Sequence, residues 1–438
     1  MAATDPLIKL YKCLAGRGAL PLDPDDPYYV EIQEASPETD PILALWNRID
    51  MAESESVNLL TGFRGNGKST ELRRLKRLLE KSGCKVFLVD MLDYVLMTKP
   101  VELSDFILSL MAALAEKIQE KTDLSPLSGS YWERMRQFLA SEVSLEGIDL
   151  TGKGPGAAAK FALTLKTDPG FKAKVQKRLE GHLTRLVEEA QQFVDGLARE
   201  IRKTAKNRDA KVVLLVDSLE QLRGTGEEAK TIYDSVVELF AGQSANLRFP
   251  KLHVVYTVPP YLTVLAHNLG RILGGNPITQ WPNIHVRTVA DGADEQGLAL
   301  MESVVTRRFA DWERIVPRKA LRRLAQASGG DLRDFFRLVR ECVVALRTAR
   351  RSDPQASLEE DAVARVVRQL RNELLPLAEE DARWLARIHA EKRAALGSEK
   401  DLPTLARFLD SNLIMNYLNG EPWYDIHPLL VQEIECRQ

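Results

Sequence analysis

The chain has 438 residues and a formal net charge of −2 at pH 7, and 45% of its residues are hydrophobic and 28% charged. These values describe an ordinary soluble globular protein that is too long for one small core, so we expect two to four domains. The balanced charge gives no general preference for nucleic acid, although it leaves room for a local basic patch.

The sequence also argues against a membrane protein and a disulfide framework. No stretch approaches 18 apolar residues and the first residues lack a signal-peptide pattern, so we expect a cytoplasmic protein without membrane contact. The four cysteines are widely separated and form no C-x-x-C pair. Reduced, buried thiols are therefore expected rather than zinc ligands or disulfides.

The N-terminal residues 1–27 combine prolines with several aspartates, and we expect an arm that docks in extended form or is disordered.

Further on, an apolar run at residues 57–61 leads into the phosphate-binding pattern G-x-x-x-x-G-K-[ST]. The amphipathic stretch behind it predicts a helix whose N-terminus points at the ligand. The residues that we predict to bind the nucleotide here are Gly62, Phe63, Arg64, Gly65, Asn66, Gly67, Lys68, Ser69 and Thr70.

Each residue type in this loop suits a phosphate ligand. Gly62, Gly65 and Gly67 can adopt positive φ, so that consecutive N–H groups curl around phosphate oxygens. Lys68 adds a positive charge at the β- and γ-phosphates, and Ser69 offers its hydroxyl to Mg²⁺. The pattern therefore predicts a nucleoside triphosphate bound with Mg²⁺.

Short, continuous apolar runs alternate with amphipathic stretches between residues 57 and 287. This alternation is typical of an α/β fold whose parallel sheet is covered on both faces. We predict five strands, at residues 57–62, 85–90, 211–217, 252–257 and 283–287. Five strands are enough for a P-loop core, which we place at residues 28–289.

The interval between the second and third predicted strands exceeds what one crossover helix needs, so we expect an insertion at residues 102–205. Periodic apolar residues predict a helix at 102–120 and a long polar helix at 171–205. Between them, residues 142–168 alternate polar and apolar residues around a Gly/Pro-rich turn, which predicts a β-hairpin or loop excursion. This excursion is either a contact surface or a decorative insertion.

Beyond residue 290 the pattern changes to helices with Leu and Arg spacing, and we assign residues 290–350 to a helical lid. In the last segment, residues 351–438, helices are followed by two short apolar runs on either side of Asn419 and Gly420. This dipeptide predicts a hairpin with a type I′ turn. Helices followed by one hairpin suggest a winged-helix-like domain.

A Mg²⁺-nucleotide enzyme needs an acid at the end of a strand beside the P-loop, and Asp217 ends the third predicted strand. Glu220, three residues further on, is the candidate that orients or deprotonates the attacking water, unless it is a solvated helix residue. Thr257 ends the fourth strand and could contact the γ-phosphate or cap the strand. His253 and His285 lie inside predicted strands and are interpreted as core or face residues.

Two arginines are candidates for further phosphate contacts. Arg333 opens a lid helix behind Gly330 and Asp331, where a guanidinium could reach the phosphates. Arg271 lies between the fourth and fifth predicted strands and could be offered to the γ-phosphate of a neighbouring subunit, with Arg248 as the alternative.

The order of these features resembles the AAA+ class of P-loop ATPases: a P-loop, a strand-ending Asp, a strand-ending Thr, a lid with GGDLR and a terminal winged helix. Within this class the chain is most similar to the signal-transduction ATPases called STAND and to origin-recognition initiator ATPases. The resemblance implies that residues 28–32 hold the adenine base, with Tyr29 or Val30 against it. It further implies Walker A at Lys68 and Ser69, Walker B at Asp217, sensor 1 at Thr257 and sensor 2 at Arg333.

One departure from the family pattern bears on activity. Typical AAA+ members carry Glu directly after the Walker B Asp, whereas Ser218 follows Asp217 here and the acid stands at Glu220, similar to STAND and related KAP ATPases. We therefore expect slow hydrolysis and a nucleotide switch, controlled by ATP and ADP, that governs self-association or a partner effector protein. Bacterial signalling or defence would be compatible with this design.

Two other classes of function stay open. A DNA-binding initiator or loader would use the winged helix, with Arg347, Arg350 and Arg351 on phosphates. However, residues 402–416 contain Arg407 as their only base, so a winged helix that docks protein or is autoinhibitory is preferred. A P-loop kinase acting on a small molecule is less consistent with the GGDLR lid.

Overall fold

The structure is a computed structural model that describes most of the chain. The described residues are 5–32, 40–120, 132–139, 156–204, 210–224, 228–394, 398–419 and 421–436. They form two compact units. The first comprises Met1–Asp40, Gly62–Arg73 and Trp281–Gln438, and the second comprises Pro41–Thr61 and Arg74–Gln280. The phosphate-binding loop thus belongs by its contacts to the first unit.

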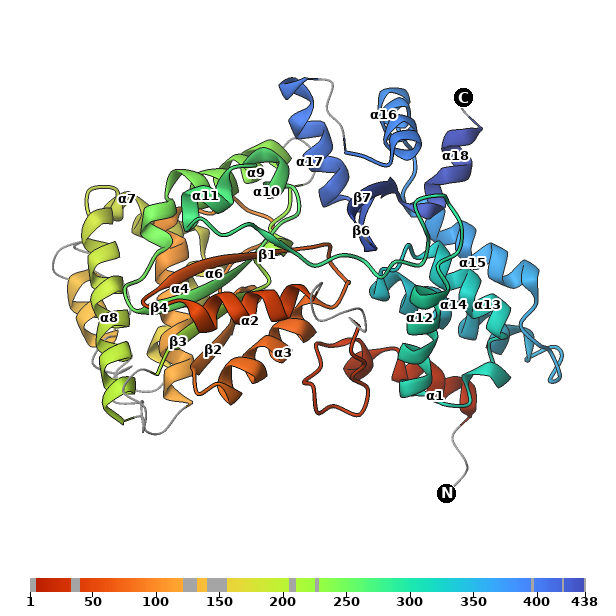
Figure 1. The fold of residues 1–438 in the computed structure, drawn as a ribbon, viewed down its shortest axis with the longest axis horizontal. Coiled ribbons are helices and arrows are strands. Elements are labelled where there is room, and N and C mark those ends of the chain that lie inside the picture. Colours follow the sequence, from red (N-terminus) through yellow and green to blue (C-terminus); the bar gives the residue numbers. More distant parts are fainter. Residues whose placement is uncertain are drawn as a thin grey trace. The chain divides into compact units, whose positions relative to one another are not determined.

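The second unit is built on a parallel five-stranded sheet, which confirms the predicted α/β class (Figure 1). Its strands are β1 Ser56–Thr61, β2 Lys85–Asp90, β3 Val212–Asp217, β4 Leu252–Val258 and β5 Thr279–Gln280. They lie in the order β2-β3-β4-β1-β5, so β4 separates β3 from β1. Every residue of β3 and β4 is buried, which explains why these strands are continuous apolar runs.

Helices flank this sheet (Figure 1). They are α2 Pro41–Met51, α4 Leu103–Gln119, α6 Ala157–Thr167, α7 Pro169–Leu179, α8 Leu183–Thr204, α9 Ala229–Val237, α10 Leu262–Leu265 and α11 Leu269–Leu273. Helix α4 packs against β2, α6 and α8, which accounts for its apolar residues on nearly all sides. Helix α3, Lys68–Lys81, starts at the end of the phosphate-binding loop, and its residues divide between the two units.

The first unit is helical with one hairpin. Its longer elements are α1 Pro6–Cys13, α12 Glu295–Arg308, α13 Arg318–Ala327, α14 Leu332–Ala349, α15 Glu360–Glu373, α16 Glu379–Glu391, α17 Leu402–Asp410, β6 Ile414–Asn419, β7 Glu421–Ile426 and α18 Val431–Glu435. A single apolar core joins α1 to α12 through α15, with Leu10, Met301, Leu324 and Phe335 among its buried members. The N-terminal arm therefore contains a docked helix, which the sequence did not predict.

The predicted hairpin near the C-terminus is confirmed, since β6 and β7 pair antiparallel with Asn419 opposite Glu421. Gly420, on which the predicted turn type depends, lies outside the described residues. The helices predicted for residues 290–350 are present as α12, α13 and α14. The proposed domain boundaries, the lid and the winged-helix character of the last segment stay predictions.

The fifth predicted strand, residues 283–287, is wrong. The strand that completes the sheet is β5, in which Thr279 and Gln280 pair with Leu60 and Thr61 of β1. Residues 283–286 run outside any strand, and Arg287 makes a single bridge to Ala293. The apolar residues Ile284 and Val286 are buried in the helical core of the first unit rather than in a sheet.

Two predictions within the insertion also need correction. The predicted excursion at 142–168 lies partly outside the described residues, but its last part is helix α6, whose Phe161 and Leu165 are buried. The predicted long helix at 171–205 is two helices, α7 and α8, separated by residues 180–182. None of the described helices combines the length and apolarity that a membrane crossing requires.

Gly330 is a position where the fold of the first unit tolerates no side chain. Its φ is +81°, and an added Cβ would lie 1.8 Å from Ile284 O. Gly16, in the same unit, also has positive φ, of +53°, but an added Cβ would meet nothing within 4 Å. We expect Gly330→Ala to lower the free energy of unfolding by about 1–3 kcal/mol more than Gly16→Ala. Both substitutions strain the backbone, but only the Cβ at residue 330 also overpacks its surroundings. Thermal unfolding of both variants checks this, and equal losses would contradict it.

Candidate nucleotide-binding site

The predicted phosphate-binding loop has the backbone that its glycines allow. Gly65 and Gly67 have φ of +89° and +92°, in the left-handed region where a side chain is strained. Helix α3 begins at Lys68, so Ser69 lies in its first turn and the N–H of Thr70 donates to Gly67 O at 3.0 Å. The loop therefore leads directly into a helix N-terminus, whose partial positive charge favours an anion.

Trp281 holds the loop in place through two hydrogen bonds. Its Nε1 donates to Asn66 O at 2.9 Å, and Asn66 Nδ2 donates to Trp281 O at 3.0 Å. Lys68 is buried, and its Nζ donates to Phe63 O and to Asn66 Oδ1 at 3.3 Å. The lysine charge is thus held within the loop rather than in solvent.

The N-terminus of α14 lies against the same loop. A Cβ on Gly65 would be 2.7 Å from Asp331 Oδ1 and 2.8 Å from Arg333 Cβ, so only glycine fits there without a shift. Asp331 caps the helix by accepting from the N–H of Asp334 at 3.0 Å. The structure therefore brings Arg333 beside the loop, and its predicted contact with a phosphate stays a prediction.

Residues 28–32 approach the start of α3. Tyr29 Oη donates to Glu71 Oε1 at 3.3 Å, and Ile32 would be 3.5 Å from a Cβ on Gly67. Val30 packs, partly buried, on the helical core of the first unit. The segment that the sequence assigned to the adenine base thus lies next to the loop.

Helix α12 holds this segment, and the N-terminal arm contacts the loop. The N–H of Leu22 donates to the hydroxyl of Thr70 at 3.1 Å, so this side chain of the loop already has a protein partner. Arg308 donates to Tyr28 O at 3.2 Å, and its guanidinium lies 4.8 Å from the ring centroid of Phe336. Burial lowers the pKa of Arg308 to about 10.

In the second unit, the carboxyl ends of β3 and β4 bring three predicted catalytic residues together. Asp217 ends β3 and is buried, and its Oδ1 accepts from the N–H of Ser218 at 2.7 Å. Thr257 is fully buried near the end of β4, and its hydroxyl accepts from the N–H of Leu219 at 3.0 Å. Glu220 follows in the same turn and is 4% exposed. The turn after β3 is therefore fixed by Thr257.

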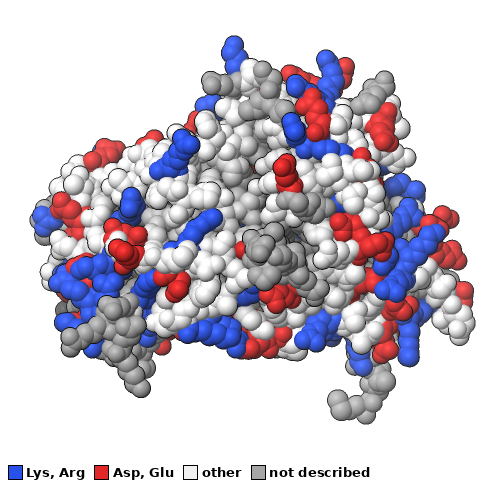
Figure 2. Space-filling view, in the orientation of Figure 1, with Lys and Arg blue, Asp and Glu red and all other residues white. Residues whose placement is uncertain are grey.

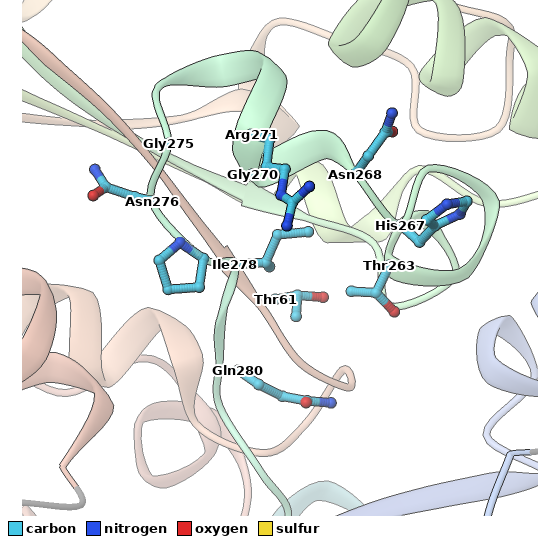
Figure 3. Close-up of a pocket in the computed structure, with 11 residues that line it drawn as sticks. Thr61, Thr263, His267, Asn268, Gly270, Arg271, Gly275, Asn276, Ile278 and Gln280 are labelled. Carbon is cyan, nitrogen blue, oxygen red and sulfur yellow. The ribbon is translucent and has the colours of Figure 1, made fainter.

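Arg271 is exposed on α11, beside a pocket of about 440 Å³ in the second unit. Figure 3 shows its side chain extending into this pocket, which is also lined by Thr61, Thr263 and Gln280. None of the described residues that line this pocket carries a carboxylate. An arginine in such surroundings is available to an anionic group from outside, as the prediction of a role in a neighbouring subunit requires. Arg248, the alternative, is also exposed.

The two histidines differ in their surroundings. His253 is fully buried in β4, as predicted, and burial together with the charge of Lys211 lowers its pKa to about 4. His285 is not in a strand, and its Nδ1 lies 3.1 Å from Asp294 Oδ2.

One group of side chains in the first unit has the spacing of a metal site but the charges of an ion-pair network. Asp291, His389 and Asp425 could each direct one ligand atom to a common point. Lys392 Nζ lies 2.7 Å from Asp291 Oδ1 and 3.0 Å from Asp425 Oδ2, and Arg287 approaches both carboxylates. Two cations thus already neutralise the two acids.

Comparison with known proteins gives similarity only at the level of solved structures. No family model and no curated protein matches the chain. The ADP form of the ORC2 protein from Aeropyrum pernix is 12% identical with a TM-score of 0.42, covering 97% of this chain and 96% of that one. CDC6P from Pyrobaculum aerophilum is 13% identical with a TM-score of 0.37, covering 94% and 96%. A point variant of RuvB from Thermotoga maritima is 13% identical with a TM-score of 0.35, covering 92% and 94%. These values assign neither a family nor an activity.

Sequence reasoning missed three residues that contact the loop. Trp281 gave no signal, because an isolated aromatic residue after a short strand fits many environments. Asp331 was recognised as a helix start, but its contact with Gly65 was not. Asp410, which pairs with Arg64 of the loop, lies 346 residues further along the chain, where no local pattern could reveal it.

The carboxyl group of Asp331 makes the stability of the first unit dependent on pH. Burial, and next the charge of Asp334, raise the pKa of Asp331 to about 7, against about 4 in an unfolded chain. A raised pKa contributes stability that is fully present below about pH 4 and is lost as the pH rises through 7. We expect Asp331→Asn, which still caps α14, to be more stable than the wild type at pH 8 and to lose most of this advantage by pH 5.

Urea unfolding at both pH values measures the difference. Asp5→Asn, at the N-cap of α1 in the same unit, is the matched control, because Asp5 accepts from the N–H of Leu7 in the same way but is not buried. An Asp331→Asn effect that is the same at pH 5 and pH 8 would show that the carboxyl does not titrate in this range.

Proposed function

We propose that the chain is an ATP-binding, slowly hydrolysing switch of the AAA+ type. The observation that carries the proposal is the loop itself, with left-handed Gly65 and Gly67, a helix N-terminus at Lys68 and the N-terminus of α14 beside it. Consecutive N–H groups and a buried lysine are what a triphosphate needs.

Each predicted residue has a chemical role in this proposal. Lys68 binds the β- and γ-phosphates, Arg333 stabilises the γ-phosphate, and Tyr29 and Val30 lie against the base. Thr257 acts through the turn that it holds after β3, by keeping the N–H of Leu219 bonded.

The donor set suits Mg²⁺, because the Ser69 hydroxyl and the Asp217 carboxylate are oxygen ligands of the kind that this ion prefers. Ser69 lies in the first turn of α3, and Asp217 is buried at the end of β3. When bound, Mg²⁺ neutralises charge on the β- and γ-phosphates. Asp217 would hold the ion mostly through its bound water.

Slow turnover follows from the position of the acid. Ser218, the residue after Asp217, has φ of +71°, and the chain then turns so that Glu220 is the first acid available as a base. Because Glu220 is only 4% exposed, its carboxylate can orient water only where the turn after β3 leaves room for a water molecule. A long-lived bound nucleotide favours a switch over continuous mechanical work.

The regulated event is proposed to be self-association or the binding of a partner effector protein. Arg271 is exposed and lines a pocket whose described residues include no acid, so it can meet the γ-phosphate of a second copy. This proposed role is compatible with bacterial signalling or defence.

The charge distribution gives little support to a DNA-binding initiator. Figure 2 shows Lys and Arg interspersed with Asp and Glu over the face in view. Arg407 is the basic residue of α17, and its guanidinium lies 2.5 Å from the carboxylate of Asp381. Arg318 and Arg322 both form ion pairs with Glu302. Binding to the phosphates of DNA normally requires several Lys or Arg side chains without acidic neighbours.

Replacing Lys68 tests nucleotide binding. We expect Lys68→Ala to weaken ATP binding by about 10- to 100-fold, because a charged hydrogen-bond donor to the phosphates is lost. Lys76→Ala, at a half-buried position on the same helix, should bind normally. Calorimetry with ATP and Mg²⁺ measures the affinity, and light scattering should show a mass change with ATP for the wild type and none for Lys68→Ala. A wild-type mass that ignores ATP would contradict the assembly switch.

Replacing Glu220 separates binding from hydrolysis. We expect Glu220→Gln to keep ATP binding and lower the rate of phosphate release by about 100-fold or more, the contribution of a positioned general base. Glu228→Gln, at an exposed glutamate in the same unit, controls for the loss of charge. If Glu220→Gln hydrolyses ATP at the wild-type rate, Glu220 is not the base.

A further inference from the structure

Arg64 of the phosphate-binding loop is joined to the C-terminal segment of the chain. Its NH2 lies 2.5 Å from Asp410 Oδ1, and the side chains are only 15% and 5% exposed. Arg64 follows Phe63, which is buried, and precedes Gly65, which lies against Asp331. The contact therefore involves the stretch of loop whose backbone is expected to meet phosphates.

Asp410 has a physical reason to need this arginine. It is the last residue of α17, where the helix dipole places partial negative charge and disfavours a carboxylate. A carboxylate so little exposed also requires a charged or hydrogen-bonding partner. Arg64 supplies both a positive charge and a directed N–H, so the end of α17 is stabilised by the loop.

The same pairing has a cost for an anionic ligand. Arg64 would otherwise add positive potential to the loop, but the carboxylate of Asp410 neutralises it at contact distance. A pair with little solvent exposure is weakly screened, so this effect persists at physiological salt. Phosphate groups and Asp410 therefore compete for one guanidinium.

We propose that Asp410 is a positioning residue that restrains nucleotide binding through Arg64. The carboxylate holds Arg64 on α17, and bound phosphate draws it into the loop, so that nucleotide binding loosens the docking of α17. This inference rests on the proposed function, because it requires that the loop binds a nucleotide. Linkage makes the effect reciprocal: docking of α17 through the Arg64–Asp410 ion pair weakens nucleotide binding by the same factor by which bound nucleotide weakens that docking.

Asp410→Asn tests the restraint in the full-length protein. Asn is isosteric and can still accept a hydrogen bond from Arg64, but it removes the competing charge. We expect ATP to bind about fivefold tighter or more than to the wild type, in the range of ordinary coupling between sites. Asp381→Asn is the matched control, because it breaks the ion pair of Arg407 on the same helix and leaves Arg64 and Asp410 together.

A double-mutant cycle shows whether Asp410 acts through Arg64. Asp410→Asn should change ATP affinity in the wild type and have no effect in an Arg64→Ala background. An equal gain in both backgrounds, or a gain of the same size from Asp381→Asn, would mean that the substitution merely loosens the C-terminal segment. Unchanged or weaker binding by Asp410→Asn would overturn the proposal.

Hydrogen exchange of the unmodified protein gives a test that does not depend on the variants folding. ATP should raise amide exchange in residues 402–410 of the wild type, and should not do so in Lys68→Ala. A wild type that binds ATP without this change overturns the restraint alone. A wild type that binds no ATP overturns the proposed function as well.

Discussion

The close approach of Gly65 to the N-terminus of α14 is the constraint on which the first unit depends. Because a Cβ would collide with Asp331 and Arg333, the loop and the helix can meet only at a glycine. Their meeting places the N-termini of α3 and α14 at one loop, where two sets of helix N–H dipoles favour an anion. The same approach buries Asp331, the residue that caps α14, so one carboxylate is brought into a site built for negative charge.

The loop is also connected to the rest of the first unit by a continuous series of contacts. Trp281 forms hydrogen bonds with Asn66, and the next residues of its segment bring Ile284 O against Gly330, in the turn before α14. The N–H of Asn283 donates to Asn416 O of β6, and Tyr417 Oη donates to Gly329 O at 2.9 Å. Residues 281–284 thus join the loop, the turn before α14 and the hairpin, which explains why residues 62–73 group with the C-terminal half rather than with their own strand.

Sequence patterns predicted the features that depend on residues close together in the chain. Strands β1 to β4 were found because burial on both faces demands continuous apolar runs, and the P-loop because its chemistry lies in eight consecutive residues. The two-residue strand β5 has no pattern of its own, so the apolar residues Ile284 and Val286 were mistaken for it although they belong to a helical core. The close contact of Asp331 with Gly65 and the ion pair of Asp410 with Arg64 depend on tertiary packing between distant segments, which the periodicity of the sequence cannot show.

Two carboxylates beside a phosphate-binding loop distinguish this site from one built for maximal affinity. An amide at either position would keep the cap of α14 or a hydrogen bond to Arg64 and would not repel phosphate. In the proposed switch, the acids would therefore convert part of the binding free energy of a nucleotide into work on the protein: a proton retained at Asp331, or an ion pair broken at Asp410. The two differ in kind. The Asp331 contribution varies with pH near neutrality, whereas the Asp410 contribution depends on whether α17 is docked, so only the second can carry a conformational signal from the loop to the C-terminal segment.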